Sequence, residues 1–495
     1  MKSFLVILLI LAISCNGQDY KTYYFDQKVN HEGFEMNDLT FKQKYLVKDD
    51  FYRYDKGPIL FYCGNEGPIE MFYNNTGFQT HTLAKELNGL VVFMEHRYFG
   101  ESWPFGNEEE SLKKGNNKYL TSLQALNDYV VFLNWFKKSL GCADDECPVI
   151  AIGGSYGGML AAWIRMKFPN VVDASLAASA PIYQFLNREG LNQTLFYSII
   201  TRNYAQNGCS DKIHQAYQYL TNIIDSPMST KYFKYQYDSI FANISQAMNT
   251  CEPITNSTGL TQLRTYMDTA YSYMAMTNYP QASSFLRSMP AWPANASCIP
   301  MEAVNSNSTV FELFSAIKLS TDTFYNYDQS ANCSDISQGD DGASDNDMSG
   351  WNILACSDMV LPMASNGKTD MFYNQPWNFE QYKEWCNYTY GVTPNYDWAL
   401  DFYGGRNDLE MENFSNIFFS NGMLDPWSGG SPTEYLSEDL PTNYMYASAH
   451  HNDLRLPQEG DPESVVQGRE LEIKYLKKWI QHKLPPNYFI NKSDY

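Results

Sequence analysis

Apolar residues follow two different patterns along the chain. Between residues 40 and 190, short apolar runs alternate with longer stretches in which apolar residues recur every three or four positions. The short runs predict buried strands at 58–64 (PILFYCG), 89–100 (GLVVFMEHRYFG) and 147–154 (CPVIAIGG). The longer stretches predict helices at 122–140 and 157–168. Strands that alternate with helices predict a parallel sheet covered on both faces.

The pattern changes near residue 190 and changes back near residue 405. In between, helical periodicity dominates at 194–204, 210–224 and 259–276. Strand-like runs return at 416–430 and 442–455, and a last amphipathic helix is predicted at 463–484. An α/β core interrupted by a mainly helical insertion, or cap, accounts for this order. The predicted division is 1–17 (signal peptide), 18–190 (first part of the core), 191–405 (insertion) and 406–495 (second part of the core).

The first 17 residues are typical of a secretory signal peptide. Lys2 supplies a positive start, residues 4–13 form an apolar run, and cleavage is predicted near Gly17. The run is short for a bilayer span, although a membrane anchor stays open as the alternative. We expect a chain that enters the secretory pathway, with no membrane association after cleavage and a lysosomal, vacuolar or extracellular destination.

The composition excludes several kinds of partner. Lys and Arg number 35 against 56 Asp and Glu, which gives a net charge of -21 and excludes a nucleic-acid-binding surface. No CxxC pair or His/Cys cluster is present, so neither a metal site nor a cofactor is expected. Cys15 lies in the signal, and the nine other cysteines leave at least one thiol unpaired. Cys63, in an apolar strand, is the candidate for that thiol.

Ten Asn-x-Ser/Thr sequons agree with passage through the secretory lumen. They lie at Asn74, Asn192, Asn243, Asn256, Asn295, Asn307, Asn332, Asn387, Asn413 and Asn491.

The segment 153–157 (GGSYG) breaks the chain between a predicted strand and a predicted helix. This arrangement, Gly153-x-Ser155-x-Gly157, matches the nucleophile elbow, in which a tight turn lifts a serine above the sheet. A Gly-rich turn without chemistry is the plainer interpretation. A serine hydroxyl also needs a base, so the interpretation requires an acid and a histidine further along the chain, in that order.

Asp425 and the pair His450 and His451 meet that requirement. Each follows a predicted strand, and in an open α/β sheet such strand ends share one edge. Asp425 also fits the opening of an Asp-Pro turn, and either histidine also fits a packed core. The residues alone do not choose between His450 and His451.

Longer motifs identify the chain as similar to one serine peptidase family. Three segments resemble its catalytic blocks: GGSYGGMLAAW (153–163), NGMLDPWSGG (421–430) and AHHNDLR (449–455). The family groups Pro-X carboxypeptidase with dipeptidyl peptidase II, and the resemblance runs from about residue 40 to residue 482. It implies an α/β-hydrolase fold with a helical, disulfide-bonded cap, and cleavage beside proline. The catalytic residues it implies are Ser155, Asp425 and His450.

Further site residues follow from the elbow and from the resemblance. The backbone N–H of Tyr156 and the Gly64-Asn65 loop are expected to form the oxyanion hole. Arg455 is expected to lower the pKa of the catalytic histidine, because a nearby cation disfavours the imidazolium. The expected proline pocket contains Met159, Trp427 and Leu361, and Glu66 is placed to meet a substrate ammonium.

The resemblance also implies three disulfides, Cys209–Cys298, Cys251–Cys333 and Cys356–Cys386. A fourth, Cys142–Cys147, is expected to close a local loop, and Cys63 then remains unpaired.

The leading hypothesis is a serine exopeptidase that cleaves proline-containing peptides through an acyl-enzyme. A carboxypeptidase and a dipeptidyl peptidase that releases Xaa-Pro dipeptides are its two versions. An esterase or lipase on the same fold and a catalytically silent binding protein are more distant alternatives. A homodimer is one of the oligomeric states left open.

Overall fold

The computed structural model describes residues 19–33, 38–54, 56–226, 234–339, 348–486 and 488–489. The expected signal peptide and the sequon at Asn491 lie outside these residues.

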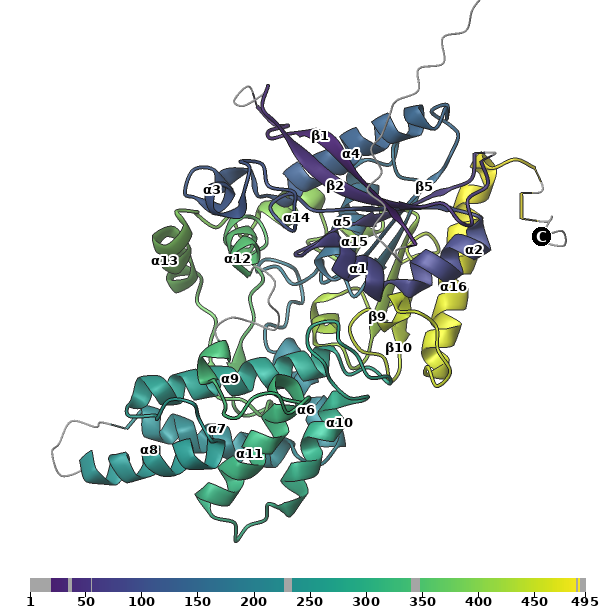
Figure 1. The fold of residues 1–495 in the computed structure, drawn as a ribbon. Helices are drawn as coiled ribbons and strands as arrows, with labels where there is room; N and C mark the ends of the chain where they lie inside the picture. Colours follow the sequence, from purple (N-terminus) through teal and green to yellow (C-terminus); the bar gives the residue numbers. More distant parts are fainter. Residues whose placement is uncertain are drawn as a thin grey trace, which may run out of the picture.

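One mixed sheet of eight strands forms the centre of the molecule (Figure 1). In sheet order the strands are β1 (Lys21–Lys28), β2 (Thr40–Lys48), β4 (Leu90–Met94), β3 (Ile59–Cys63), β5 (Val149–Gly154), β6 (Ala174–Ala178), β9 (Ile417–Gly422) and β10 (Thr442–Met445). β1 pairs antiparallel with β2, and β2 with β4, whereas all later neighbours run parallel. A short antiparallel pair, β7 (Ser365–Asn366) and β8 (Asn374–Gln375), lies apart.

The helices connect these strands and build the cap. They are α1 (Ile69–Asn75), α2 (Ala84–Leu87), α3 (Glu108–Leu112), α4 (Ser122–Ser139), α5 (Tyr156–Lys167), α6 (Leu195–Gln206), α7 (Ser210–Ile224), α8 (Lys234–Met248), α9 (Ser257–Met276), α10 (Pro293–Cys298), α11 (Val310–Tyr325), α12 (Met348–Ser357), α13 (Phe379–Tyr390), α14 (Trp398–Tyr403), α15 (Asp408–Met411) and α16 (Glu463–Ile480). A π-helical turn, η1 (Phe78–Leu83), and short 3₁₀ turns complete the set, among them η5 (Pro426–Gly430) and η6 (Asn452–Leu454).

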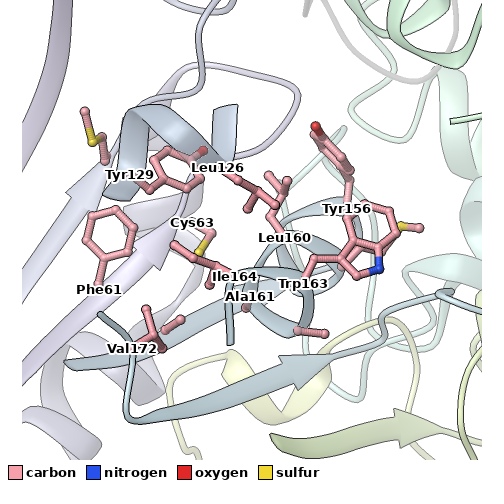
Figure 2. Close-up of a cluster of buried hydrophobic side chains, with 14 of the residues drawn as sticks. Phe61, Cys63, Leu126, Tyr129, Tyr156, Leu160, Ala161, Trp163, Ile164 and Val172 are labelled. Atoms are coloured by element: carbon pink, nitrogen blue, oxygen red, sulfur yellow. The ribbon is translucent and has the colours of Figure 1, made fainter. Parts of the chain in front are cut away.

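The central strands are apolar along their whole length because both faces of the sheet are covered. In β3, Phe61 and Cys63 point to the face covered by α4 and α5, whereas Leu60 and Tyr62 point to the face covered by α1, α2 and α16. Figure 2 shows the first of these interfaces, where side chains of β3, α4 and α5 pack together. Cys63 is the free cysteine of the described part of the chain, and it is fully buried.

The cap has a hydrophobic core of its own. Helices α6 to α11 gather below the sheet in Figure 1 and pack around buried residues such as Tyr217, Met267 and Phe314. The disulfides Cys209–Cys298 and Cys251–Cys333 link distant segments within this body. Both are pairs expected from the resemblance. Because each joins residues more than 80 positions apart, it restricts the unfolded cap strongly.

The later part of the insertion packs on the hydrolase core instead. Leu354 of α12 and Tyr403 of α14 belong to the same buried cluster as α5, and the Tyr403 ring stacks on Trp163 at 4.1 Å. The disulfide Cys356–Cys386 links α12 to α13, and Cys142–Cys147 closes a loop before β5. The chain therefore has an α/β-hydrolase fold that carries a large helical, disulfide-bonded insertion.

Two properties of the described residues bear on the class of protein. None of their helices has both the length and the apolar character that a bilayer crossing requires. The nine sequon asparagines among them are all exposed at the surface.

A buried ion pair ties the first strand to the core. The Arg97 guanidinium donates to both carboxylate oxygens of Asp128, at 2.7 and 2.6 Å, and both side chains are fully buried. Arg97 also donates to the carbonyl oxygens of Lys28, the last residue of β1, and Val29, the residue after it. Burial opposes the ionised form of Asp128, but Arg97 and His31 together hold its pKa below the ordinary value.

We predict that Asp128→Asn lowers the free energy of unfolding by about 3–5 kcal/mol, because it leaves the Arg97 charge buried without its partner. Urea unfolding followed by tryptophan fluorescence measures the loss. Asp26→Asn is the matched control, since Asp26 pairs with Lys42 and both side chains are 65% exposed. That control should cost under about 1 kcal/mol. Equal losses in the two variants would contradict the prediction.

Candidate active site

Ser155 stands on a strained turn at the carboxyl end of β5. Its backbone has φ 60° and ψ -129°, which is unfavourable for a residue with a side chain. The Ser155 N–H donates to the carbonyl oxygen of Ala178 at 2.9 Å, which ties the turn to β6. The strain is therefore held by the sheet, and the hydroxyl lies directly before α5.

Glycines around Ser155 allow α5 to approach the strands closely. A Cβ atom on Gly153 would lie 2.1 Å from the carbonyl oxygen of Gly157, and one on Gly157 would lie 2.7 Å from the carbonyl oxygen of Cys63. Neither distance is compatible with a side chain. The Gly-x-Ser-x-Gly pattern is thus a steric requirement of the turn and forms a nucleophile elbow.

Asp425 and His450 form a buried pair on two neighbouring strand ends. Asp425 follows β9 and His450 follows β10, and their side chains are 0% and 2% exposed. The His450 Nδ1 atom lies 2.9 Å from Asp425 Oδ2, while Asp425 Oδ1 accepts a hydrogen bond from the backbone N–H of Trp427 at 2.9 Å. If Nδ1 carries the proton, Nε2 keeps the lone pair that a general base needs.

The cap holds this histidine in place. The backbone N–H of His450 donates to the carbonyl oxygen of Met276, the last residue of α9, at 3.0 Å. The Tyr279 hydroxyl donates to the carbonyl oxygen of His450 at 3.1 Å. The Asn203 amide of α6 likewise donates to the carbonyl oxygen of Leu424, directly before Asp425, at 2.9 Å.

Ser155 and His450 line one cavity of about 120 Å³. Among the described residues no hydrogen bond joins their side chains. Such bonds are often long in unliganded enzymes and shorten when substrate binds.

The two adjacent histidines have different surroundings. His450 faces Asp425, whereas the His451 ring packs edge-on against Phe285 of the cap, with centroids 5.5 Å apart. Burial, followed by the charges of His450 and Arg455, holds the pKa of His451 well below its ordinary value. Only His450 therefore has the carboxylate partner that a catalytic base requires.

Two backbone N–H groups are free to serve in the expected oxyanion hole, as far as the described backbone hydrogen bonds go. Tyr156 opens α5, so its N–H has no partner within the helix. Across the cavity, the N–H of Asn65 has no backbone partner among the described residues. Gly64, the other expected donor, is a correction: its N–H already donates to the carbonyl oxygen of Met94 at 3.1 Å. Gly64 is instead required sterically, because a Cβ there would lie 2.1 Å from that same oxygen.

The expected proline pocket lies in the same cavity as Ser155. Met159, Leu361 and Trp427 all line it, and so does Glu66. Sequence reasoning missed the further aromatic residues that complete the apolar lining, which are Phe72, Tyr273, Phe285 and Trp351. No local pattern in the sequence marks these four residues as parts of one pocket, because they come from segments far apart along the chain.

A second cavity of about 450 Å³ continues the first one between the core and the cap. The two share Tyr273, Met276, Trp351, Leu361 and Trp427. Its other lining residues include Phe196, Trp377 and Tyr382. An extended chain that enters the site can therefore continue along an aromatic groove.

Glu66 is held in a setting that favours its neutral form. Burial raises the pKa of its carboxyl group, and its Oε2 atom is buried without a hydrogen-bond partner in the described part of the chain. A neutral carboxyl group can donate a hydrogen bond, but it attracts an ammonium group only weakly.

Arg455 lies near the histidine pair but does not contact either ring through a hydrogen bond. Its guanidinium donates to Ser283 Oγ at 3.2 Å and to Asn75 Oδ1 at 3.4 Å, and it lies 4.3 Å from the centre of the Tyr279 ring. Its charge lowers the pKa of His451. An effect on His450 itself stays a prediction.

A buried carboxyl pair lies beneath the histidine loop, and sequence reasoning did not find it. Asp453 of η6 and Glu472 of α16 are both 0% exposed, and neither Asp453 oxygen has a hydrogen-bond partner among the described residues. Burial raises the pKa of Asp453 to about 6, and burial together with Asp453 raises the pKa of Glu472 well above its ordinary value. Arg469 opposes both shifts.

The strained serine, the buried Asp–His pair and the sheet topology define a serine hydrolase of the α/β-hydrolase class. Residues 27–472 match the serine carboxypeptidase S28 family. The chain belongs to that family and is a serine-type peptidase.

Its relatives extend over almost the whole chain. It is 41% identical to lysosomal Pro-X carboxypeptidase of Mus musculus, over 94% of this chain and 90% of that protein. It is 39% identical to lysosomal Pro-X carboxypeptidase of Bos taurus, over 93% and 88%. It is 35% identical to prolyl carboxy peptidase like protein 5 of Caenorhabditis elegans, over 94% and 90%.

The buried Asp453–Glu472 pair predicts that the free energy of unfolding is larger in mild acid than at neutral pH. Both folded-state pKa values lie above the unfolded values near 4, so the native state binds more protons than the unfolded state between about pH 4 and the folded pKa values. The free energy of unfolding should fall as pH rises through this window, by up to about 1.4 kcal/mol per pH unit for each proton. Urea unfolding at pH 5.0, 6.0 and 7.0 measures the slope.

Glu472→Gln should flatten that slope, because an amide stays neutral at every pH and keeps the shape of the protonated acid. Glu380→Gln is the matched control, since the Glu380 side chain is 74% exposed. An unchanged slope in Glu472→Gln would remove the pair as its source.

Proposed function

We propose that the protein is a Pro-X carboxypeptidase, which removes the C-terminal residue from peptides in which proline comes next to last. The observation that carries the proposal is the common cavity in which Ser155 and His450 lie beside Met159, Leu361 and Trp427. The names of the mouse and bovine relatives support the same reaction.

The proposed mechanism assigns one role to each group. His450 takes the proton of Ser155 as its oxygen attacks the prolyl carbonyl carbon. Asp425 orients the imidazole and stabilises the imidazolium that forms. The N–H groups of Tyr156 and Asn65 stabilise the oxyanion of the tetrahedral intermediate.

The intermediate collapses when His450 gives its proton to the leaving amine. The C–N bond breaks, the C-terminal amino acid departs, and the peptide remains as an ester on Ser155. A water molecule, deprotonated by the same imidazole, then hydrolyses that ester and restores the serine.

Proline selectivity follows from the shape and polarity of the pocket. A proline residue has no amide N–H, so it leaves no donor unsatisfied in an apolar pocket. Residues with longer polar side chains would lose hydration there without compensation. The neighbouring aromatic groove offers room for the residues that precede proline.

The state of Glu66 favours the carboxypeptidase over the dipeptidyl peptidase. A dipeptidyl peptidase has to bind a free ammonium group close to the serine. Glu66 is the acidic residue that lines this cavity, and burial raises its pKa, which weakens its use as a counter-ion. Release of Xaa-Pro dipeptides is therefore the second candidate.

We further propose that the protein acts in the lysosome or outside the cell. Four disulfides suit an oxidising route of synthesis, and the exposed sequons are accessible for glycosylation. The lysosomal names of the relatives favour an acidic compartment.

Purified wild-type protein should cleave an N-blocked peptide ending in Pro-Phe and leave an Xaa-Pro-amide reporter intact. Ser155→Ala should reduce the cleavage by at least about four orders of magnitude and abolish fluorophosphonate labelling, because the nucleophile is gone. Ser139→Ala, at an exposed serine, is the control and should keep full rate. Preferential release of Xaa-Pro would instead select the dipeptidyl peptidase.

Arg455→Ala should move the acidic limb of the kcat/KM profile to higher pH. The Arg455 charge lowers the pKa of His451, and we expect the loss of the same nearby cation to ease protonation of the adjacent catalytic base. Arg455→Lys keeps the charge and should keep the limb closer to its wild-type position. A limb that does not move in Arg455→Ala rules out this role.

A further inference from the structure

We propose that His451 binds the free carboxylate of the departing C-terminal residue and so selects substrates that end one residue after proline. This proposal rests on the carboxypeptidase function proposed above. It gives His451 a specificity role that is separate from the proton transfers of His450.

The size of the leaving group restricts where its carboxylate can lie. In a single departing residue, the nitrogen and the carboxylate carbon are separated by two bonds, about 2.5 Å. His450 must reach that nitrogen to protonate it. The group that binds the carboxylate therefore has to be an immediate neighbour of His450.

His451 is that neighbour on the cavity wall. Its ring centroid lies 4.5 Å from that of His450, and both residues line the cavity with Ser155. Its backbone N–H donates to Ser179 Oγ at 2.7 Å, and its ring packs against Phe285. These contacts position the ring, and neither of them involves a ring nitrogen.

The ring nitrogens of His451 are available to a ligand. Within the described residues, neither ring nitrogen forms a hydrogen bond to another residue, and the one polar contact the ring makes is with the backbone of His451 itself. Neither nitrogen is among the unpartnered polar atoms that are closed off from solvent. The residue is 8% exposed, so this small accessible surface includes the polar part of the ring. A polar group that is almost buried and lacks a hydrogen-bond partner in the free protein is stabilised when a ligand supplies that partner.

No stronger cation competes for the carboxylate among the described residues that line the cavity, since they include no lysine or arginine. The nearest guanidinium, that of Arg455, is held by Asn75, Ser283 and the Tyr279 ring. Burial raises the pKa of Glu66, the acidic side chain in the lining, which weakens its repulsion of an anion.

The charges around His451 also explain how it would respond to the ligand. His450 and Arg455 on its own loop disfavour its protonation, Glu66 faces the cavity from the loop before α1, and Phe285 of the cap is apolar. In the free enzyme the ring is a neutral N–H donor. A bound carboxylate favours the imidazolium, so binding should take up a proton and strengthen in acid.

The test compares two substrates that differ in one group, an N-blocked peptide ending in Pro-Phe and its C-terminal amide. Wild-type enzyme should prefer the free acid. In His451→Phe the acid-to-amide ratio of kcat/KM should fall at least tenfold, because a hydrogen bond to a charged group is lost. His451→Gln, which retains an N–H donor, should restore part of the ratio.

Controls separate this role from structural damage. His482→Gln, at an exposed histidine, should keep the wild-type ratio. The wild-type preference for the free acid should weaken between pH 5 and pH 7.5, and the preference of His451→Phe should not. A ratio that is unchanged in both His451 variants overturns the proposal. If the wild-type enzyme itself does not cleave the free acid, the proposed function fails first, and that result is seen without any variant.

Discussion

The catalytic arrangement depends on how closely α5 approaches the sheet. Ser155 can keep a positive φ only because its N–H is bonded to β6 and because the glycines on either side allow backbone to lie against backbone. Behind the turn, Leu160, Ala161 and Ile164 lie in one buried cluster with side chains of β3 and α4 (Figure 2). The strain at one residue is therefore balanced by the packing of a whole layer. The loops that carry Asp425 and His450 emerge from the same edge of the sheet, so the elbow fixes the point on which they converge.

Burial shifts the pKa values of several titratable groups in and beneath the site toward their uncharged forms. The carboxyl groups of Glu66, Asp453 and Glu472 all have raised pKa values, and His451 has a lowered one. Each is a titratable group that favours its uncharged form, although the chain as a whole carries a net charge of -21. The acidic partner of the base, Asp425, is hydrogen-bonded instead to a backbone N–H and to His450. In the cleft, burial therefore weakens the charge of several groups, and hydrogen bonds hold the catalytic pair.

The sequence predicted the parts of the fold whose signal is local. The strands around 59–63 and 149–154 and the helix after Ser155 follow from apolar runs and from a glycine-rich break. β6 was missed because its sequence, ASLAA, is rich in alanine, which has little preference for strands. The choice of His450 over His451 needed the resemblance or the structure, because it depends on which ring turns toward Asp425. The occupied N–H of Gly64 and the contact of Asp453 with Glu472 depend on partners far along the chain, which no local pattern reveals.

Hydrogen bonds join Met276, Tyr279 and Asn203 of the cap to the loops that carry His450 and Asp425, and they have a consequence for how a peptide enters and leaves. The cap is bonded to the segments that carry the base and its acid, so a movement of the cap away from the core would have to break these bonds or displace His450 and Asp425. The second cavity, which shares its lining with the catalytic one, offers an extended chain end a route that leaves these bonds intact.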